Sequence, residues 1–393
     1  MQYRRFGRTE LSMPVFSCGG MRYQHSWKDV PAWQISRKNQ QNLEATIRRS
    51  LDVGIDHIET ARGYGTSEVQ LGRILPTFPR DKIIVQTKVS PSEHPTEFRQ
   101  NFERSLRNLR LDYVDLLSIH GINTDELLDW NAKPGGCLDV VERLQAEGKV
   151  RFIGFSTHAP TEIILKAIAT NRFDYVNLHW YYINQWNWSA IEAARERDMG
   201  IFIISPSDKG GMLYQPPAKL VKLCQPLSPI VFNDLFCLSH PQVHTLSLGA
   251  ARPTDFDEHL KVLPLLDRAD EILPDILTRL EREAIACLGE DWVKTWHEGL
   301  PNPEQTPGNI NIPIILWLRN LAIAYDMTDY AIMRYNLLGS AGHWFPGHNA
   351  NRVHRFDLRS CLSASPHADK IPEFLADADR RFGGKPVKRS SQQ

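Results

Sequence analysis

Short apolar runs alternate with longer segments of helical apolar spacing along the first 265 residues of the chain. β-branched runs of this kind predict strands, and apolar residues that recur every three or four positions predict helices. Helices are predicted near residues 42–51, 67–75, 97–109, 138–146, 161–169 and 190–196. Strands are predicted at residues 15–20, 55–59, 83–89, 113–120, 151–156, 175–179, 201–205 and 244–248.

This alternation predicts an α/β fold in which crossover helices join parallel strands. Eight β-α units in about 250 residues are typical of a closed eight-fold β/α (TIM) barrel. An open doubly wound sheet would normally carry a G-x-G-x-x-G segment after its first strand, and this chain has none. Residues 1–13 predict a small hairpin that seals the barrel floor, and residues 24–38 predict a polar loop.

The alternation stops near residue 265, beyond which apolar residues recur at helical spacing. Two further helices are predicted near residues 313–325 and 329–338. The pattern therefore predicts two domains, a β/α barrel over residues 1–265 and an all-helical C-terminal domain over residues 266–393.

The charge composition argues against polyanionic partners. Lys+Arg and Asp+Glu both number 46, so no net field attracts nucleic acid or an anionic membrane. The longest apolar stretches are too short to span a bilayer, and the N-terminus lacks a basic segment followed by an apolar run. The six cysteines are scattered without a C-x-x-C pair, which predicts reduced, structural thiols. We therefore expect a cytoplasmic protein that binds neither nucleic acid nor membranes.

Polar residues gather at the predicted carboxyl ends of three consecutive strands, which line one mouth of a barrel. Glu59 and Tyr64 follow the second strand, Lys88 ends the third and His120 ends the fourth. A nearby ammonium stabilises a phenolate, so Lys88 is expected to lower the pKa of Tyr64. Glu59 can serve as the counter-charge of Lys88, and His120 can donate to a carbonyl oxygen. Each residue alone is more often a packing or salt-bridge residue than a functional one, but together the four predict a proton-transfer site.

The ordered segments IETARGYGTSE, VQTKV, YVDLLSIHG and KVRFIGFSTH resemble the signature segments of the aldo-keto reductase family. In that family Asp, Tyr, Lys and His form a catalytic tetrad, and the matching positions here are Glu59, Tyr64, Lys88 and His120. Glu59 departs from the family's aspartate by one methylene and keeps its charge. The resemblance implies an NAD(P)H-dependent oxidoreductase that reduces a small aldehyde or ketone to an alcohol, with Tyr64 as the proton donor.

The resemblance also implies where a nicotinamide cofactor binds. Asn177 stands where the family commonly has Gln, Thr157 where Asn is common, and Ile204 where a Tyr usually stacks on the nicotinamide. Arg252 suits the 2′-phosphate of NADP(H), although Asp255 stands where an Arg is usual, and we expect NADP(H) in preference to NAD(H). The implied cofactor contacts are Gly20, Met21, Arg22, Ser156, Asn177, Ser205, Ser207, Lys209 and Arg252.

Two C-terminal segments, GNINIPIILWLRNLAIAYDMTDYAIMRYNLL and SASPHADKIPEFL, resemble the ferredoxin-like domain of one aldo-keto reductase subgroup. That domain holds iron-sulfur clusters through cysteine thiolates. Among the matching positions only Cys361 is a cysteine, so no cluster is predicted, and the histidine spacing matches no metal-ligand pattern. The other matching positions are Trp296, Gly299, Asn302, Thr306, Arg355, Leu358 and Ser365.

Three functions remain open from the sequence. The first is carbonyl reduction, and the second is a non-catalytic nicotinamide-binding barrel that acts as a regulatory or assembly module, with a protein partner bound through the C-terminal domain. The third, an iron-sulfur electron-transfer enzyme, would require a brown protein. The substrate is not identified, although an aromatic cluster can line its pocket or pack in the core, namely Tyr181, Tyr182, Trp186 and Trp188.

Overall fold

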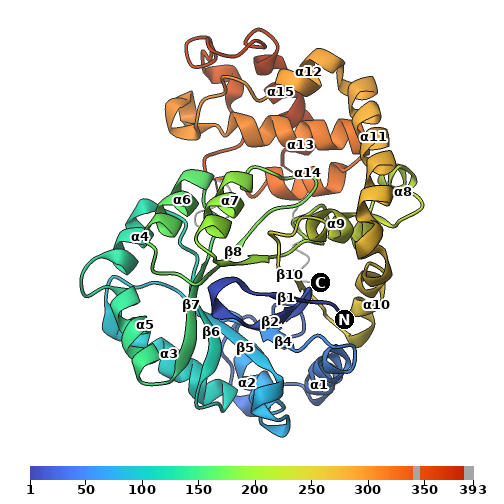
Figure 1. The fold of residues 1–393 in the computed structure, drawn as a ribbon. Helices are drawn as coiled ribbons and strands as arrows, with labels where there is room; N and C mark the ends of the chain where they lie inside the picture. The colour runs from blue at the N-terminus through green and yellow to red at the C-terminus, as the bar shows by residue number, and fades with distance from the viewer. Residues whose placement is uncertain (340–345, 385–393) are drawn as a thin grey trace. The chain divides into compact units, whose positions relative to one another are not determined.

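Eight parallel strands close into a barrel in this computed structural model, which describes residues 1–339 and 346–384 (Figure 1). The strand order is β10-β3-β4-β5-β6-β7-β8-β9, so all neighbours along the chain pair in parallel and the last strand pairs with the first. All eight predicted strands are confirmed. They are β3 (Phe16–Gly19), β4 (His57–Glu59), β5 (Ile84–Val89), β6 (Val114–His120), β7 (Val150–Ser156), β8 (Tyr175–Leu178), β9 (Gly200–Ile203) and β10 (Thr245–Leu248).

An antiparallel hairpin of β1 (Tyr3–Arg5) and β2 (Ser12–Pro14) precedes the barrel, as predicted. Phe6 is fully buried and clusters with Phe202 of β9 and with Tyr175, the first residue of β8. A Cβ on Gly200 would lie 2.7 Å from the Phe6 ring, so only glycine accommodates the aromatic side chain there. The hairpin therefore seals the amino end of the barrel and leaves the carboxyl end as the open mouth.

Helices surround the barrel and connect its strands (Figure 1). The predicted helices are confirmed, and α4 and the helices around β10 are additional. Thr124 caps α4 by accepting a hydrogen bond from the Leu127 N–H at 3.2 Å, which is a recognisable helix-start signal. The helices are α1 (Arg37–Asp52), α2 (Ser67–Leu71), α3 (Pro95–Leu109), α4 (Asp125–Ala132), α5 (Cys137–Ala146), α6 (Thr161–Ala169), α7 (Trp188–Glu196), α9 (Pro229–Leu238) and α10 (Phe256–Leu260).

The chain forms two compact units, one of residues 1–210 with 233–269 and one of residues 211–232 with 270–393. The second unit thus includes residues 211–232, which the contiguous sequence division at residue 265 placed with the barrel. The reason is a set of contacts that joins α8 to α11, among them a Lys219–Glu283 ion pair of 2.7 Å. Helices in this part of the chain are α8 (Ala218–Cys224), α11 (Ala269–Leu288), α12 (Glu290–Thr295), α13 (Ile312–Tyr325), α14 (Thr328–Tyr335) and α15 (Ile371–Phe382).

Residues at and beside the positions that match the first cysteine run contact the second resembling segment within the helical unit. A Cβ on Gly299 would lie 2.1 Å from the Ala364 carbonyl oxygen, and Thr295 Oγ1 lies 2.8 Å from His367 Nε2. The resemblance itself stays a prediction, and residues 340–345 and 385–393 of the predicted domain lie outside the described residues.

Residues 1–339 and 346–384 hold neither a candidate membrane span nor a candidate metal cluster. Neither range contains a helix with the length and apolar character needed to cross a membrane. Nor do three or more His, Cys, Asp or Glu side chains in these ranges gather in a geometry that could hold a metal ion.

Candidate active site

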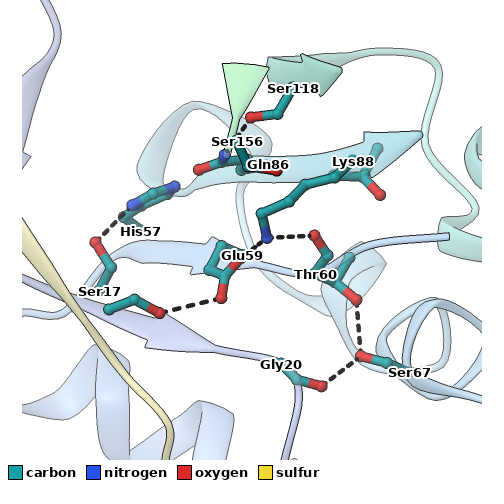
Figure 2. Close-up of polar contacts among 12 residues, drawn as sticks. Ser17, Gly20, His57, Glu59, Thr60, Ser67, Gln86, Lys88, Ser118 and Ser156 are labelled. Atoms are coloured by element: carbon teal, nitrogen blue, oxygen red, sulfur yellow. Dashed lines mark hydrogen bonds and ion pairs between the residues drawn. The ribbon is translucent and has the colours of Figure 1, made fainter. Parts of the chain in front are cut away.

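An ion pair between Glu59 and Lys88 is buried at the carboxyl ends of β4 and β5. Figure 2 shows the two side chains facing each other between the strands. Lys88 Nζ contacts Glu59 Oε2 directly and also donates to the Thr60 carbonyl oxygen at 3.0 Å. Ser247 Oγ donates to the second carboxylate oxygen of Glu59 at 3.1 Å. The pair therefore satisfies both charges and holds the ammonium in one direction.

Two hydroxyl groups connect the residue after β3 to the segment that holds this ion pair. Thr60 Oγ1 lies 2.7 Å from Ser67 Oγ, which donates to the Gly20 carbonyl oxygen at 3.0 Å (Figure 2). A Cβ on Gly20 would lie 2.6 Å from the Glu59 carbonyl oxygen. Gly20 is therefore required for close packing against Glu59, whatever else it contacts.

Tyr64 and His120 lie beside the ion pair. Their rings meet edge to face with centroids 5.8 Å apart, and Lys88 Nζ lies 5.1 Å from the centroid of the Tyr64 ring. Tyr64 comes from the loop after β4, and His120 is the last residue of β6. The structure thus brings together Glu59, Tyr64, Lys88 and His120, which are 61 positions apart at most in the sequence.

Burial governs the protonation of these groups. It raises the pKa of Tyr64 to about 12, so the net shift is opposite in direction to the lowering predicted from Lys88. Desolvation of the buried phenol is the cause, and the Lys88 ammonium is directed at Glu59 and at the Thr60 carbonyl. Burial, with the positive charges of Lys88 and Lys209, lowers the pKa of His120 to about 3. At neutral pH the phenol therefore carries its proton and the imidazole is uncharged.

Burial also affects Lys88 itself, because it disfavours the charged ammonium and lowers the pKa of this lysine. The adjacent Glu59 carboxylate acts in the opposite direction, since an opposite charge at contact distance stabilises the ammonium. The ion pair is thus what keeps a positive charge beside the phenol.

Two of the sequence-predicted cofactor residues carry buried polar atoms that lack a protein partner. Among the described residues none hydrogen-bonds the Asn177 amide, whose Nδ2 and Oδ1 are both fully buried, and none bonds Ser207 Oγ. Buried polar groups are normally paired, and each unpaired one costs about 1–3 kcal/mol. A ligand with an amide group of its own would satisfy Asn177. Ser156 lies opposite Asn177 in the β7–β8 register and accepts from the Gly121 N–H at 3.2 Å.

Arg22 and Arg252 make contacts within the loops around β10. Arg22 Nη1 donates to the Gly249 carbonyl oxygen at 2.8 Å, which joins the loop after β3, including Met21, to the loop after β10. Arg252 Nε donates to Asp255 Oδ1 at 3.0 Å, and the Arg252 side chain is 72% exposed. Asp255 thus partly neutralises the guanidinium that was expected to select a 2′-phosphate.

The loop after β9 contains Ser205, Ser207 and Lys209. Ser205 has a φ of 56°, in the left-handed region that non-glycine residues rarely adopt, and its carbonyl oxygen accepts from the Lys209 N–H at 3.0 Å. The Lys209 side chain is directed at His158 and His179, with Nζ 3.3 Å from His158 Nδ1 and 3.2 Å from His179 Nε2. Sequence reasoning assigned Lys209 to phosphate and did not identify the two histidines, although both closely follow predicted strands.

Two further residues at the mouth were missed. Ser247 lies in β10, on the carboxyl half of a predicted strand, and a survey of every strand end would have found it. The indole of Trp27 packs edge to face on Tyr64 with centroids 6.1 Å apart and is 41% exposed. It lies in the loop after β3, whose fold no local pattern predicts.

The aromatic residues after β8 mostly pack within the barrel unit. Tyr181 is fully buried, Trp188 lies 5.1 Å from Trp180 between ring centroids, and Tyr182 lies 5.6 Å from Phe236. Trp186 is 41% exposed. Packing therefore accounts for three of the four.

The fold and the site together define a closed eight-stranded β/α barrel that carries a buried carboxylate–ammonium pair, a phenol and an imidazole at its mouth. The family model of the aldo/keto reductase family matches residues 16–213, about half of the chain and most of the barrel. The chain belongs to the aldo/keto reductase family.

Individual relatives are distant. L-galactose dehydrogenase of Arabidopsis thaliana is 29% identical over 187 residues, which are 44% of this chain and 57% of that protein. L-glyceraldehyde 3-phosphate reductase of Escherichia coli is 26% identical over 176 residues, 41% of this chain and 46% of that protein. The chain thus spans about half the length of the curated relatives it matches.

The fold itself is shared with solved structures. An aldo-keto reductase from Bacillus halodurans is similar with a TM-score of 0.59 at 19% identity, covering 71% of this chain and 96% of that one. At this identity the likeness concerns the barrel fold alone.

Proposed function

We propose that this protein is an NAD(P)H-dependent oxidoreductase that reduces the carbonyl group of a small aldehyde or ketone to an alcohol. The observation that carries the proposal is the buried Glu59–Lys88 pair beside Tyr64 and His120 at the barrel mouth. Membership of the aldo/keto reductase family supports the same reaction class.

Each of the four residues has a distinct proposed role. Tyr64 gives its proton to the carbonyl oxygen, because its raised pKa keeps the hydroxyl protonated at neutral pH. Lys88 stabilises the phenolate that remains, and Glu59 holds Lys88 in place. Neutral His120 donates one N–H to the carbonyl oxygen and orients it. The nicotinamide, when bound, supplies the hydride to the carbonyl carbon.

We assign the proposed cofactor contacts chiefly to residues with unpaired buried polar atoms and to their neighbours. Asn177 and Ser156 would hold the carboxamide, since an amide can both donate to and accept from the unpaired Asn177 side chain. Ser205 and Ser207 would contact phosphate oxygens, with Ser207 contributing its unpaired hydroxyl. The backbone of the segment Gly20, Met21 and Arg22 would run alongside the nicotinamide ribose. Asn177 is the strongest of these assignments because a carboxamide removes its burial cost.

Replacing Asn177 with leucine should separate stability from binding. The cofactor-free protein should gain about 1–3 kcal/mol in free energy of unfolding, because leucine of similar size removes two unpaired polar atoms. NADPH and NADH should bind more weakly. Urea unfolding and fluorescence titration measure the two effects.

Asn187 provides the matched control, because it is also buried but has both ends of its amide bonded, to Thr161 Oγ1 and to the His179 carbonyl oxygen. Asn187→Leu should lose stability. A loss of stability in Asn177→Leu as well would contradict the assignment of the amide to a ligand.

NADPH is proposed as the preferred cofactor, and Asp255 limits this preference. Asp255→Asn should raise kcat/KM with NADPH about fivefold relative to NADH, since removing a negative charge near an exposed phosphate is worth about 1 kcal/mol. The amide can still accept the Ala251 N–H that now donates to Asp255 Oδ2 at 2.8 Å. Asp257→Asn, which loses an exposed ion pair with Arg49, is the control and should leave the ratio unchanged. An unchanged ratio in Asp255→Asn would remove this residue from cofactor selection.

The function is tested by following NADPH and NADH oxidation with a panel of aldehydes, ketones and quinones. The panel should include the substrates named in the two relatives, L-galactose and L-glyceraldehyde 3-phosphate. Substrate-dependent oxidation supports the reductase. Cofactor binding without oxidation on any carbonyl would instead favour a nicotinamide-binding barrel that acts as a regulatory or assembly module.

For the rest of the chain we propose a helical C-terminal domain that is a degenerate relative of the ferredoxin-type domain. Its scaffold positions carry Thr306 and Ser365 in place of thiolates, and both are buried. With Cys361 as the single cysteine among the matching positions, we propose that it binds no iron-sulfur cluster. A protein partner is its proposed ligand.

A further inference from the structure

Three nitrogen-bearing side chains meet at the barrel mouth outside the four proposed catalytic residues. His158 Nδ1 lies 2.5 Å from His179 Nε2, and the two rings stack with centroids 4.7 Å apart. Lys209 Nζ lies within 3.3 Å of both nitrogens. His179 is 2% exposed, whereas His158 and Lys209 are partly exposed. The cluster is thus anchored by a buried imidazole and open toward solvent.

Tyr181 determines which ring nitrogen of the buried His179 carries the proton. Its hydroxyl donates to the Ile204 carbonyl oxygen at 2.5 Å and contacts His179 Nδ1 with its oxygen. A hydroxyl that already donates can only accept from Nδ1, so the His179 proton lies on Nδ1 and Nε2 carries a lone pair. His179 Nε2 therefore offers one lone pair, which can accept from Lys209 or from His158. This network directs the ammonium of Lys209.

The cluster lies close to the proposed reaction centre. His120, Ser156 and Asn177 form one row across β6, β7 and β8 in the strand register. His158 and His179 each follow that row by two residues. The charge of Lys209 also acts on His120, whose pKa it helps to lower. A positive charge thus lies within electrostatic reach of the group that would orient the carbonyl.

We propose that Lys209, with His158, forms a subsite that binds an anionic group of the substrate, a carboxylate or a phosphate, while the carbonyl lies at Tyr64 and His120. An ammonium has three donors, so it can bind an anion while it holds His179. A cleft lined by charge of one sign also concentrates oppositely charged substrates. The proposal rests on the proposed reductase function and specifies its substrate class as acidic aldehydes or ketones.

The test uses matched pairs of substrates that differ in one charge. 4-Carboxybenzaldehyde is compared with 4-methylbenzaldehyde, and glyceraldehyde 3-phosphate with glyceraldehyde, so that a carboxylate and a phosphate are tested separately. Lys209→Met should lower kcat/KM for the acidic member of at least one pair by about ten- to a hundredfold, the range for a hydrogen bond to a charged group. The neutral members and the cofactor Kd should change less than twofold. Lys209→Arg should restore most of the activity.

Lys166→Met is the matched control, since Lys166 is an exposed lysine of α6 that pairs with Asp125. It should leave both pairs unchanged. Equal losses for the acidic and neutral members, or a weaker cofactor Kd in Lys209→Met, would overturn the subsite and assign Lys209 to the cofactor phosphates, while the reductase stands.

A binding measurement separates this proposal from the reductase. Calorimetric titration of the cofactor-loaded protein with benzoate and with benzamide requires no turnover. Benzoate binding that Lys209→Met abolishes supports the subsite even if no carbonyl is reduced. No preference for benzoate over benzamide, together with no preference in turnover, overturns it.

Discussion

Tyr64→Phe is expected to lower kcat for carbonyl reduction by about 10²–10⁴-fold, the usual contribution of a positioned proton donor. The variant removes one hydroxyl and keeps the ring that packs against His120 and Trp27. The phenol is protonated at neutral pH, so its proton is available to the carbonyl oxygen. Stopped-flow or steady-state NADPH oxidation with the best carbonyl of the panel measures the loss.

The same substitution at Tyr113 is the control. Tyr113 lies just before β6, at the closed end of the barrel, where its ring packs against Arg80. Tyr113→Phe should keep full activity, and Tyr64→Phe should keep the cofactor Kd and the circular dichroism of the wild type. A Tyr64→Phe enzyme within threefold of wild-type kcat would show that the proton comes from another group.

Lys88→Met is expected to lower the free energy of unfolding of the barrel by about 3–5 kcal/mol, since it leaves the Glu59 carboxylate buried without a counter-charge. The hydrogen bond from Ser247 remains but brings no positive charge. Methionine has nearly the length of lysine, so lost packing contributes little. Urea unfolding followed by barrel tryptophan fluorescence measures the change.

The double variant Glu59→Gln/Lys88→Met separates the charge from the packing. It should recover most of the stability lost in Lys88→Met, because the buried charge is gone, while reductase activity stays low in both variants. A double variant as unstable as Lys88→Met would mean that the ammonium stabilises the barrel through contacts other than Glu59.

Local patterns along the chain were sufficient for the barrel. Most strands are short runs whose residues are buried on both faces, so β5 and β6 can be recognised without knowing their neighbours. The catalytic candidates follow by the same logic, because the carboxyl ends of consecutive parallel strands must meet at one mouth. This is why Lys88 and His120 could be grouped before their distances were known.

What the sequence alone determined is therefore the order of strands, the open end of the barrel and the set of polar residues found there. The tertiary structure decided the direction in which the pKa of Tyr64 moves, the unpaired state of Asn177 and the meeting of Lys209 with His158 and His179. These properties depend on burial and on distances of a few ångströms between side chains from different strand ends. Periodicity specifies which face a residue occupies, but it carries no information about the depth or the partner of that residue across the barrel.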